Sequence, residues 1–236
     1  MSSSKSNRDY HDEKSLKKEK IKPGLRLCNL KEEPIKTIRA LQNLPRLFRY
    51  ADVAKYSANP NVFLTRALKQ EFVSRILKGF YINRLLTGRN VLRIEEVACF
   101  LRNPAYVSCE WALNYHGVIL QSPTVCTTIT LSPSVGERNK VSYMGTTIEY
   151  SKISESLFWG FVNEGGFNMA GPEKALMDML YLRKKVSFKS EFEMERINRK
   201  KIATIAEKYP QSTRKLLEEV ARTEGSMTGQ FLRDIL

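Results

Sequence analysis

The chain has 236 residues, of which 42% are hydrophobic and 10% aromatic, so it can bury a sizeable core and is not disordered throughout. It carries 39 Lys and Arg residues against 25 Asp and Glu residues. The resulting formal charge of +14 favours a polyanionic partner, either nucleic acid or an acidic membrane surface.

The excess positive charge lies almost entirely in the first part of the chain. Residues 1–94 hold 21 Lys and Arg and 8 Asp and Glu, whereas residues 95–236 hold 18 and 17. This split predicts a basic binding module joined to a second module with another role. We expect a tail over 1–22, a basic domain over 23–94 and a second domain over 95–236.

Residues 1–22 are rich in Ser, Lys, Asp and Glu and hold almost no large apolar side chains, which predicts a flexible basic tail. No apolar stretch follows the first charges, and no window approaches the roughly 18 apolar residues of a membrane span. We therefore expect a cytoplasmic protein without a membrane partner. The four cysteines are scattered and form no C-x-x-C pair, so we interpret them as reduced core residues: Cys28, Cys99, Cys109 and Cys126.

Three short helices are predicted after Pro23-Gly24. Apolar residues at helical spacing predict the first helix from Ile35. The small side chains of Ala51, Val53 and Ala54 would let a second helix, within 48–56, pack closely. Asn59 is a suitable N-cap and Pro60 a suitable first residue for a third helix, which should run to about Lys69.

A β-hairpin is predicted behind the third helix. The runs 72–77 and 80–82 are rich in β-formers and are separated by Lys78-Gly79, where Gly can take a positive φ. Three helices followed by a hairpin are the order of a winged helix-turn-helix, and 88–90 would lead out of it.

The second domain is predicted to mix helices and strands, so the whole chain belongs to the α+β class. Ser108 should cap a helix that ends at Gly117, and another helix should begin at Gly171-Pro172. The β-branched runs 124–131 and 141–153 predict two strands joined by the loop 132–136. The remainder, 192–236, is helical in character, with breaks at Pro210 and near Gly225.

Signatures of catalysis are mostly absent from the sequence, although a catalytic pair of carboxylates would leave no motif. It contains no phosphate loop, dinucleotide fingerprint, zinc-protease motif or nucleophile elbow, and we predict no metal and no cofactor. Of its two histidines, His11 lies in the tail, and we interpret His116 as a helix-end residue bonded to the last carbonyls. Lys174 and Asp178, four residues apart, are expected to form an exposed salt pair. Four aromatic residues of the second domain are expected in its core: Trp111, Phe158, Trp159 and Phe161.

The third helix carries a candidate DNA-reading face. At about 100° per residue, Phe63, Leu64, Ala67 and Leu68 form the buried side. The outward residues are then Asn61, Val62, Thr65, Arg66 and Lys69. Arg suits guanine, Asn suits adenine, and Thr can contact a base edge in the major groove. Basic residues on or beside the hairpin and the second helix would supply phosphate contacts: Arg75, Lys78, Arg84, Arg46, Arg49 and Lys55.

Three ordered blocks of the chain resemble signatures of the AbiEi antitoxins. They are Ile76-Leu-Lys-Gly-Phe-Tyr81, Ala105-Tyr-Val-Ser-Cys-Glu-Trp-Ala-Leu-Asn-Tyr-His-Gly117 and Met169-Ala-Gly-Pro-Glu-Lys-Ala-Leu-Met-Asp178. The resemblance covers roughly residues 35–220. The long Ser/Lys tail and the wide spacing before the first helix depart from the family.

The resemblance implies a regulator of a type IV toxin-antitoxin, or abortive-infection, operon. Its winged helix would repress its own promoter by binding inverted repeats in double-stranded DNA, and its C-terminal domain would counter a nucleotidyltransferase toxin encoded beside it without needing a stable complex. It supports Arg66, Lys69 and Lys78 as DNA-facing residues and supplies no catalytic residue.

Two other hypotheses remain at the level of sequence. One is an enzyme whose basic module delivers a hydrolase or transferase to nucleic acid, and the other is a regulator without a toxin.

Overall fold

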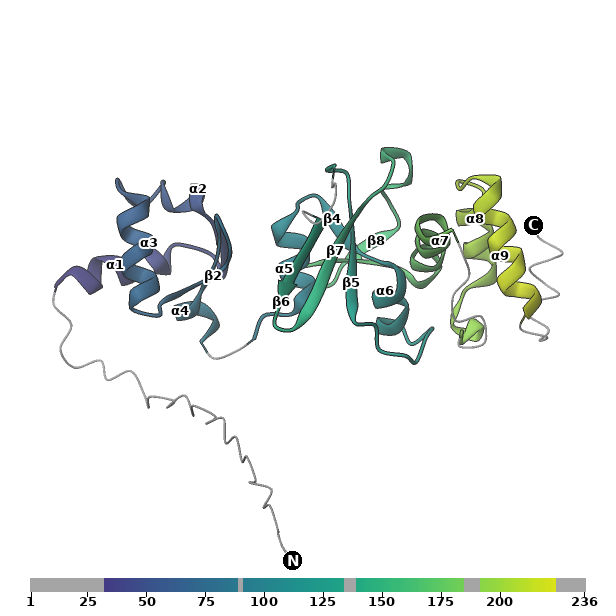
Figure 1. Ribbon diagram of the computed structural model, residues 1–236, viewed down its shortest axis with the longest axis horizontal. Coiled ribbons are helices and arrows are strands. Elements are labelled where there is room, and N and C mark those ends of the chain that lie inside the picture. The colour runs from purple at the N-terminus through teal and green to yellow at the C-terminus, as the bar shows by residue number, and fades with distance from the viewer. Residues whose placement is uncertain (1–31, 89–90, 134–138, 185–191, 224–236) are drawn as a thin grey trace, which may run out of the picture.

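The computed structural model of the chain describes residues 32–88, 91–133, 139–184 and 192–223 (Figure 1). The predicted tail, Cys28, most of the loop 132–136 and the break near Gly225 lie outside them. Helices and strands are mixed along the chain, as expected for the α+β class. Figure 1 shows the first elements at one end, a larger sheet in the middle and the last helices at the other end.

The first seven elements form a small unit, here called the N-terminal module. They are α1 (Glu32–Gln42), β1 (Leu47–Arg49), α2 (Tyr50–Val53), α3 (Pro60–Lys69), β2 (Val73–Leu77), β3 (Phe80–Asn83) and α4 (Arg84–Thr87). Its three strands pair antiparallel in the order β1-β3-β2. Gly79, at φ +89, makes the turn of the predicted hairpin.

The prediction for the region before α3 was wrong in part. Phe48 lies in strand β1 rather than in a helix, because its ring stacks on Tyr81 of β3 with centroids 5.5 Å apart. Helix α2 is therefore only four residues long. Helix α3 has the predicted bounds, although the Asn59 side chain makes no capping hydrogen bond and Pro60 alone sets the start.

The two faces of the small sheet are covered differently. Tyr81 of β3 is buried in the cluster that joins the sheet to helices α1 and α3. Its neighbour Ile82, which points to the opposite face, is buried in the larger cluster of the following domain, against which Leu47 and Phe80 also pack. One face of the sheet thus belongs to the N-terminal module and the other faces the rest of the chain.

A buried asparagine ties the N-terminal module together. Asn83 is fully buried, and its Nδ2 donates to the Leu41 carbonyl at 2.7 Å and the Leu44 carbonyl at 3.2 Å. Its Oδ1 accepts from the backbone N–H of Leu85 at 3.2 Å. This one side chain therefore joins the end of α1 to β3 and α4.

The remaining elements form the second module. They are α5 (Ile94–Leu101), β4 (Ala105–Val107), α6 (Cys109–Tyr115), β5 (Val125–Thr130), β6 (Lys140–Tyr143), β7 (Thr146–Lys152), η2 (Glu155–Leu157), β8 (Phe161–Asn163), β9 (Asn168–Ala170), α7 (Pro172–Arg183), η3 (Met194–Arg196), α8 (Arg199–Ala206) and α9 (Gln211–Thr223). Six strands form a mixed sheet in the order β6-β7-β5-β4-β9-β8.

Helices cover both faces of this sheet. Tyr150 of β7 donates its hydroxyl to the Ala98 carbonyl of α5 at 2.9 Å. The preceding residue of the strand, Glu149, points to the opposite face and lies 3.8 Å from Arg183 of α7. Strand β5, at the centre, is accordingly buried on both faces.

Several local predictions for the second module need correction. The run 141–153 is not one strand but the hairpin β6–β7, which turns at Met144-Gly145, both with positive φ. Ser108 precedes α6 as expected, yet its hydroxyl bonds to Asp178 at 2.8 Å rather than capping the helix. His116 bonds through Nε2 to the Ala170 carbonyl of β9 at 2.8 Å, not to the last carbonyls of its own helix.

Other predictions for the second module are confirmed. Cys99, Cys109 and Cys126 are free thiols, and burial raises the pKa of Cys99 to about 11. The four aromatic residues pack partly buried against the main core. Helix α7 begins at Pro172, and α8 and α9 lie on either side of Pro210. None of the helices in the described ranges has the length and apolar character that crossing a membrane requires.

Candidate nucleic-acid interface

Helix α3 has one buried side and one exposed polar side. Phe63, Leu64 and Ala67 are at most 8% exposed and pack toward the small sheet. The predicted outward residues are all exposed: Asn61, Val62, Thr65, Arg66 and Lys69. The division arises because the apolar residues recur at helical spacing.

The exposed side of α3 contains no acidic residue. Thr65 donates its hydroxyl to the Asn61 carbonyl at 2.8 Å, which fixes its rotamer. Arg66 and Lys69 lie in the last turn, and positive charge there also suits the helix dipole. The surface therefore offers one amide, one methyl group and two cations within a single helix face.

The hairpin carries two further exposed cations, Arg75 and Lys78. Arg75 lies on the edge strand β2, and its Cζ lies 5.9 Å from the ring centroid of Tyr81, its cross-strand partner. Because cross-strand partners share a face, Arg75 lies on the face of the small sheet that belongs to α3. Lys78 is exposed at the turn. The sequence did not predict that the ring of Tyr81 lies beneath the Arg75 guanidinium, because this contact follows from the register in which β2 pairs with β3.

Two predicted phosphate contacts, Arg49 and Arg84, are separated from this group. The Arg49 guanidinium lies 5.4 Å from the ring of Phe80 and donates to the Phe100 carbonyl of α5 at 3.2 Å. Arg84 donates through Nε to Ser74, whose side chain points away from the Arg75 face. Both arginines thus lie toward the second module, because that module covers the other face of the small sheet.

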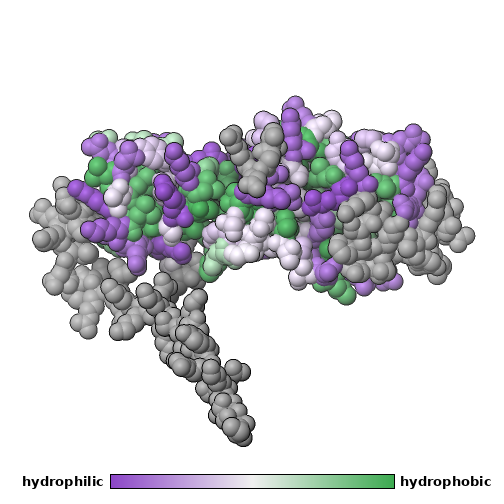
Figure 2. Space-filling model, viewed as in Figure 1, coloured by the Kyte–Doolittle hydropathy of each residue, from purple (hydrophilic) through white to green (hydrophobic). Residues whose placement is uncertain are grey.

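Two more basic residues of this region have acidic partners. Arg46 lies 3.1 Å from Glu96 of α5, and Lys55 lies 3.3 Å from Asp52. Over the whole module, residues 32–87, the sequence still has ten Lys or Arg against four Asp or Glu. Figure 2 shows hydrophilic side chains at several points over this module. The module is therefore strongly positive as a whole.

A buried charged cluster in the second module is the other feature with possible chemistry. The expected exposed pair of Lys174 and Asp178 is instead buried, with side chains 1% and 0% exposed. Lys174 also donates to the hydroxyls of Tyr106 at 2.9 Å and Tyr209 at 2.8 Å. Both tyrosines donate to Asp178 in turn, at 3.0 and 2.6 Å, and Ser108 does so as well. Each hydrogen-bonding group of the pair therefore has a partner inside the protein.

Burial controls the protonation behaviour of this cluster. Loss of water lowers the pKa of Lys174 and raises the pKa of Asp178, while each charge opposes the shift of the other. Burial likewise raises the pKa of Tyr106 and of Tyr209 far above the usual range. No residue of the cluster is more than 3% exposed. We therefore interpret the cluster as a structural element that holds β4, α7 and the segment after α8 together.

The chain matches no protein-family model and no curated protein. Among solved structures, it is similar to the crystal structure of the RV2827C protein from Mycobacterium tuberculosis. The two share 9% sequence identity and superpose with a TM-score of 0.53, over 84% of this chain and 79% of that one. The match thus spans most of both chains, and it establishes that this chain shares its α+β fold with the mycobacterial protein.

Proposed function

We propose that the protein is a transcriptional repressor that binds double-stranded DNA through a winged helix-turn-helix formed by α1 to β3. The order helix, strand, two helices and hairpin, with the sheet order β1-β3-β2, is the arrangement of such a domain. Helix α3 would enter the major groove of the DNA, and the β2–β3 hairpin would lie along the sugar-phosphate backbone.

The observation that carries this proposal is the exposed face of α3. Five adjacent outward residues include two cations and no acid, and Arg75 and Lys78 extend the positive surface along the hairpin. Arg66 and Asn61 can read base edges, while Lys69, Arg75 and Lys78 can neutralise phosphates.

The role of the second module is proposed from the resemblance to the AbiEi antitoxins. By that resemblance the protein would bind inverted repeats in its own promoter and counter a neighbouring nucleotidyltransferase toxin. Co-expression with the adjacent gene tests this part. We expect the adjacent gene alone to arrest growth and the present protein to relieve the arrest. If growth were not restored, the antitoxin role would be wrong, but the proposed repressor role would be unaffected.

A salt-titrated gel-shift assay with the full chain tests DNA binding. We expect tight binding to the DNA upstream of its own gene and weaker binding to scrambled DNA, with both falling steeply as salt rises. Equal binding to the two DNAs would contradict a sequence-specific repressor.

Replacing Arg66 by Ala should weaken binding to the specific site by about 1 to 3 kcal/mol and relax the preference for it, because a base contact is lost. The affinities for specific and scrambled DNA give both quantities. Arg84→Ala is the matched control, since Arg84 faces Ser74 on the other side of the hairpin. If Arg84→Ala had the larger effect, the assignment of the interface to the α3 side would be wrong.

Replacing Lys78 by Ala should weaken binding to all sequences similarly. A single lost phosphate contact lowers the slope of log affinity against log salt by about 0.9. Lys140→Ala, which removes an exposed lysine of β6, should leave that slope unchanged. A Lys78 variant with the wild-type slope would show that the hairpin turn does not contact DNA.

A further inference from the structure

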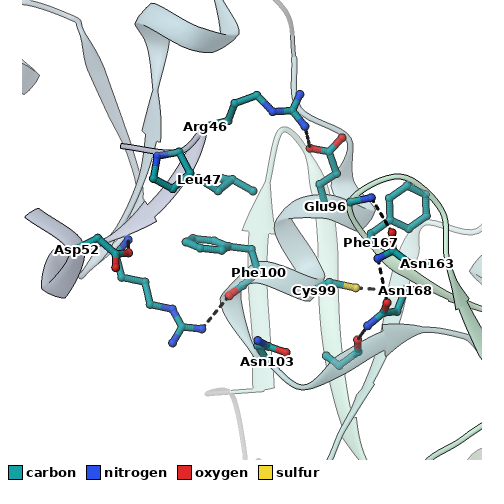
Figure 3. A pocket seen from close by; sticks show the side chains of 14 residues that line it. Arg46, Leu47, Asp52, Glu96, Cys99, Phe100, Asn103, Asn163, Phe167 and Asn168 are labelled. Atoms are coloured by element: carbon teal, nitrogen blue, oxygen red, sulfur yellow. Dashed lines mark hydrogen bonds and ion pairs between the residues drawn. The ribbon is translucent and has the colours of Figure 1, made fainter. Parts of the chain in front are cut away.

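The N-terminal and second modules enclose a cleft of about 580 Å³ where β1 faces α5 (Figure 3). Figure 3 shows Arg46 projecting from one wall toward Glu96 of α5, with Phe100 of the same helix beside the cleft. The ion pair of Arg46 with Glu96 and the hydrogen bond of Arg49 to the Phe100 carbonyl hold the walls together. A volume of this size is typical of small-molecule sites, which often lie between domains.

Among the described residues that line the cleft, one cation has no carboxylate partner. Glu96 is paired with Arg46, and Asp52 is paired with Lys55. Within the described ranges, the guanidinium of Arg49 donates a hydrogen bond to the Phe100 carbonyl, lies over the rings of Phe80 and Phe100, and forms no ion pair. Of its five N–H groups, one is donated to that carbonyl, so a forked donor pair remains for a ligand.

The opposite wall supplies amides. Asn163 donates to Asn168 at 3.2 Å, and Asn168 donates to the Ala105 carbonyl at 3.1 Å, so these two are held in place. Asn103 also lines the cleft and makes no side-chain hydrogen bond with any residue that the structure describes. Its amide can therefore donate to and accept from a ligand.

We propose that this cleft binds a small organic monocarboxylate that carries amide or hydroxyl groups. The carboxylate pairs with the fork of Arg49, and the polar body bonds to Asn103. A single negative charge matches Arg49, which has no carboxylate partner among the residues that the structure describes. A phosphate monoester, which is close to a dianion at neutral pH, would bring a second negative charge that the paired Arg46 does not balance.

The site is independent of DNA binding, so its test uses small ligands alone. N-acetyl amino acids serve as probes, their primary amides as neutral matched probes, and inorganic phosphate as the competing anion. Binding to the full chain is measured by ligand-observed NMR and titration calorimetry. We expect the acids to bind at least about tenfold more tightly than the amides and than phosphate, a difference of about 1.4 kcal/mol.

Variants locate the binding. Asn103→Ala and Arg49→Gln should each weaken binding of the acids by about tenfold or more. Asn103→Ala should change the melting temperature little, because this exposed side chain makes no hydrogen bond with any residue that the structure describes. Lys200→Gln is the control, since it removes an exposed cation of α8 that does not line the cleft. Equal binding of acids and amides, tighter binding of phosphate, no binding by any acid, or affinities unchanged in both variants would each overturn the proposal.

Discussion

Replacing Lys174 by Met is expected to lower the free energy of unfolding by about 3 to 5 kcal/mol. Methionine fills a similar volume, but it leaves the carboxylate of Asp178 fully buried without its cation. It also removes the ammonium donor from Tyr106 and Tyr209. Urea denaturation of the variant and of wild type measures the loss.

The loss should depend on pH. The ammonium of Lys174 lowers the pKa of Asp178 against the effect of burial, so in the variant this pKa rises further above the unfolded value. A group with a raised folded pKa favours the folded state at low pH, and this contribution is lost as pH rises through the folded pKa. The difference between variant and wild type should therefore be smaller at pH 5 than at pH 8.

Two further variants make the result specific. Lys200→Met changes an exposed lysine of α8 and should alter stability by no more than about 0.5 kcal/mol. The double variant of Lys174→Met with Asp178→Asn removes both charges and should recover much of the loss. If Lys174→Met alone were as stable as wild type, the pair would be solvated and the closed cluster would not exist in solution.

Replacing Asn83 by Asp should cost about 3 kcal/mol or more, because an isosteric carboxylate would be buried against two carbonyl oxygens. The amide that now donates to the Leu41 and Leu44 carbonyls is lost, and the carboxylate oxygen that replaces it faces those two acceptors. Since Asn83 joins α1, β3 and α4, the N-terminal module should open first. Hydrogen exchange of α1 and β3, compared with β5, shows this directly.

The matched control is Asn43→Asp. Asn43 also donates to a carbonyl at the end of α1, that of Arg39 at 3.1 Å, but it is exposed. Its replacement should change stability by no more than about 0.5 kcal/mol. Equal effects of the two substitutions would mean that burial of Asn83 is not what holds the module together.

The elements that sequence predicted well are those fixed locally. Helix α3 has its predicted bounds because Pro60 sets its start and apolar residues recur along one side. Strand β1 was missed because its stability comes from Phe48 stacking on Tyr81, which is 33 residues later in the chain. The contact between Phe48 and Tyr81 therefore outweighed the local preference of residues 48–56 for a helix.

The candidate site was predictable only in part. The exposed face of α3 follows from helical periodicity, whereas the placement of Arg49 and Arg84 depends on which face of the small sheet the second module covers. The spacing of Lys174 and Asp178 fits an exposed pair as well as a buried one. Only the approach of Tyr106 and Tyr209 from distant segments decides between them.

The buried charged cluster has a consequence for synthesis on the ribosome. Every element of the N-terminal module is encoded before residue 89, so this module can fold while translation continues. The cluster, by contrast, needs Tyr209, which emerges long after its other members. Until then the nascent second module holds two charges without their full set of partners, so its folding should wait for its last helices.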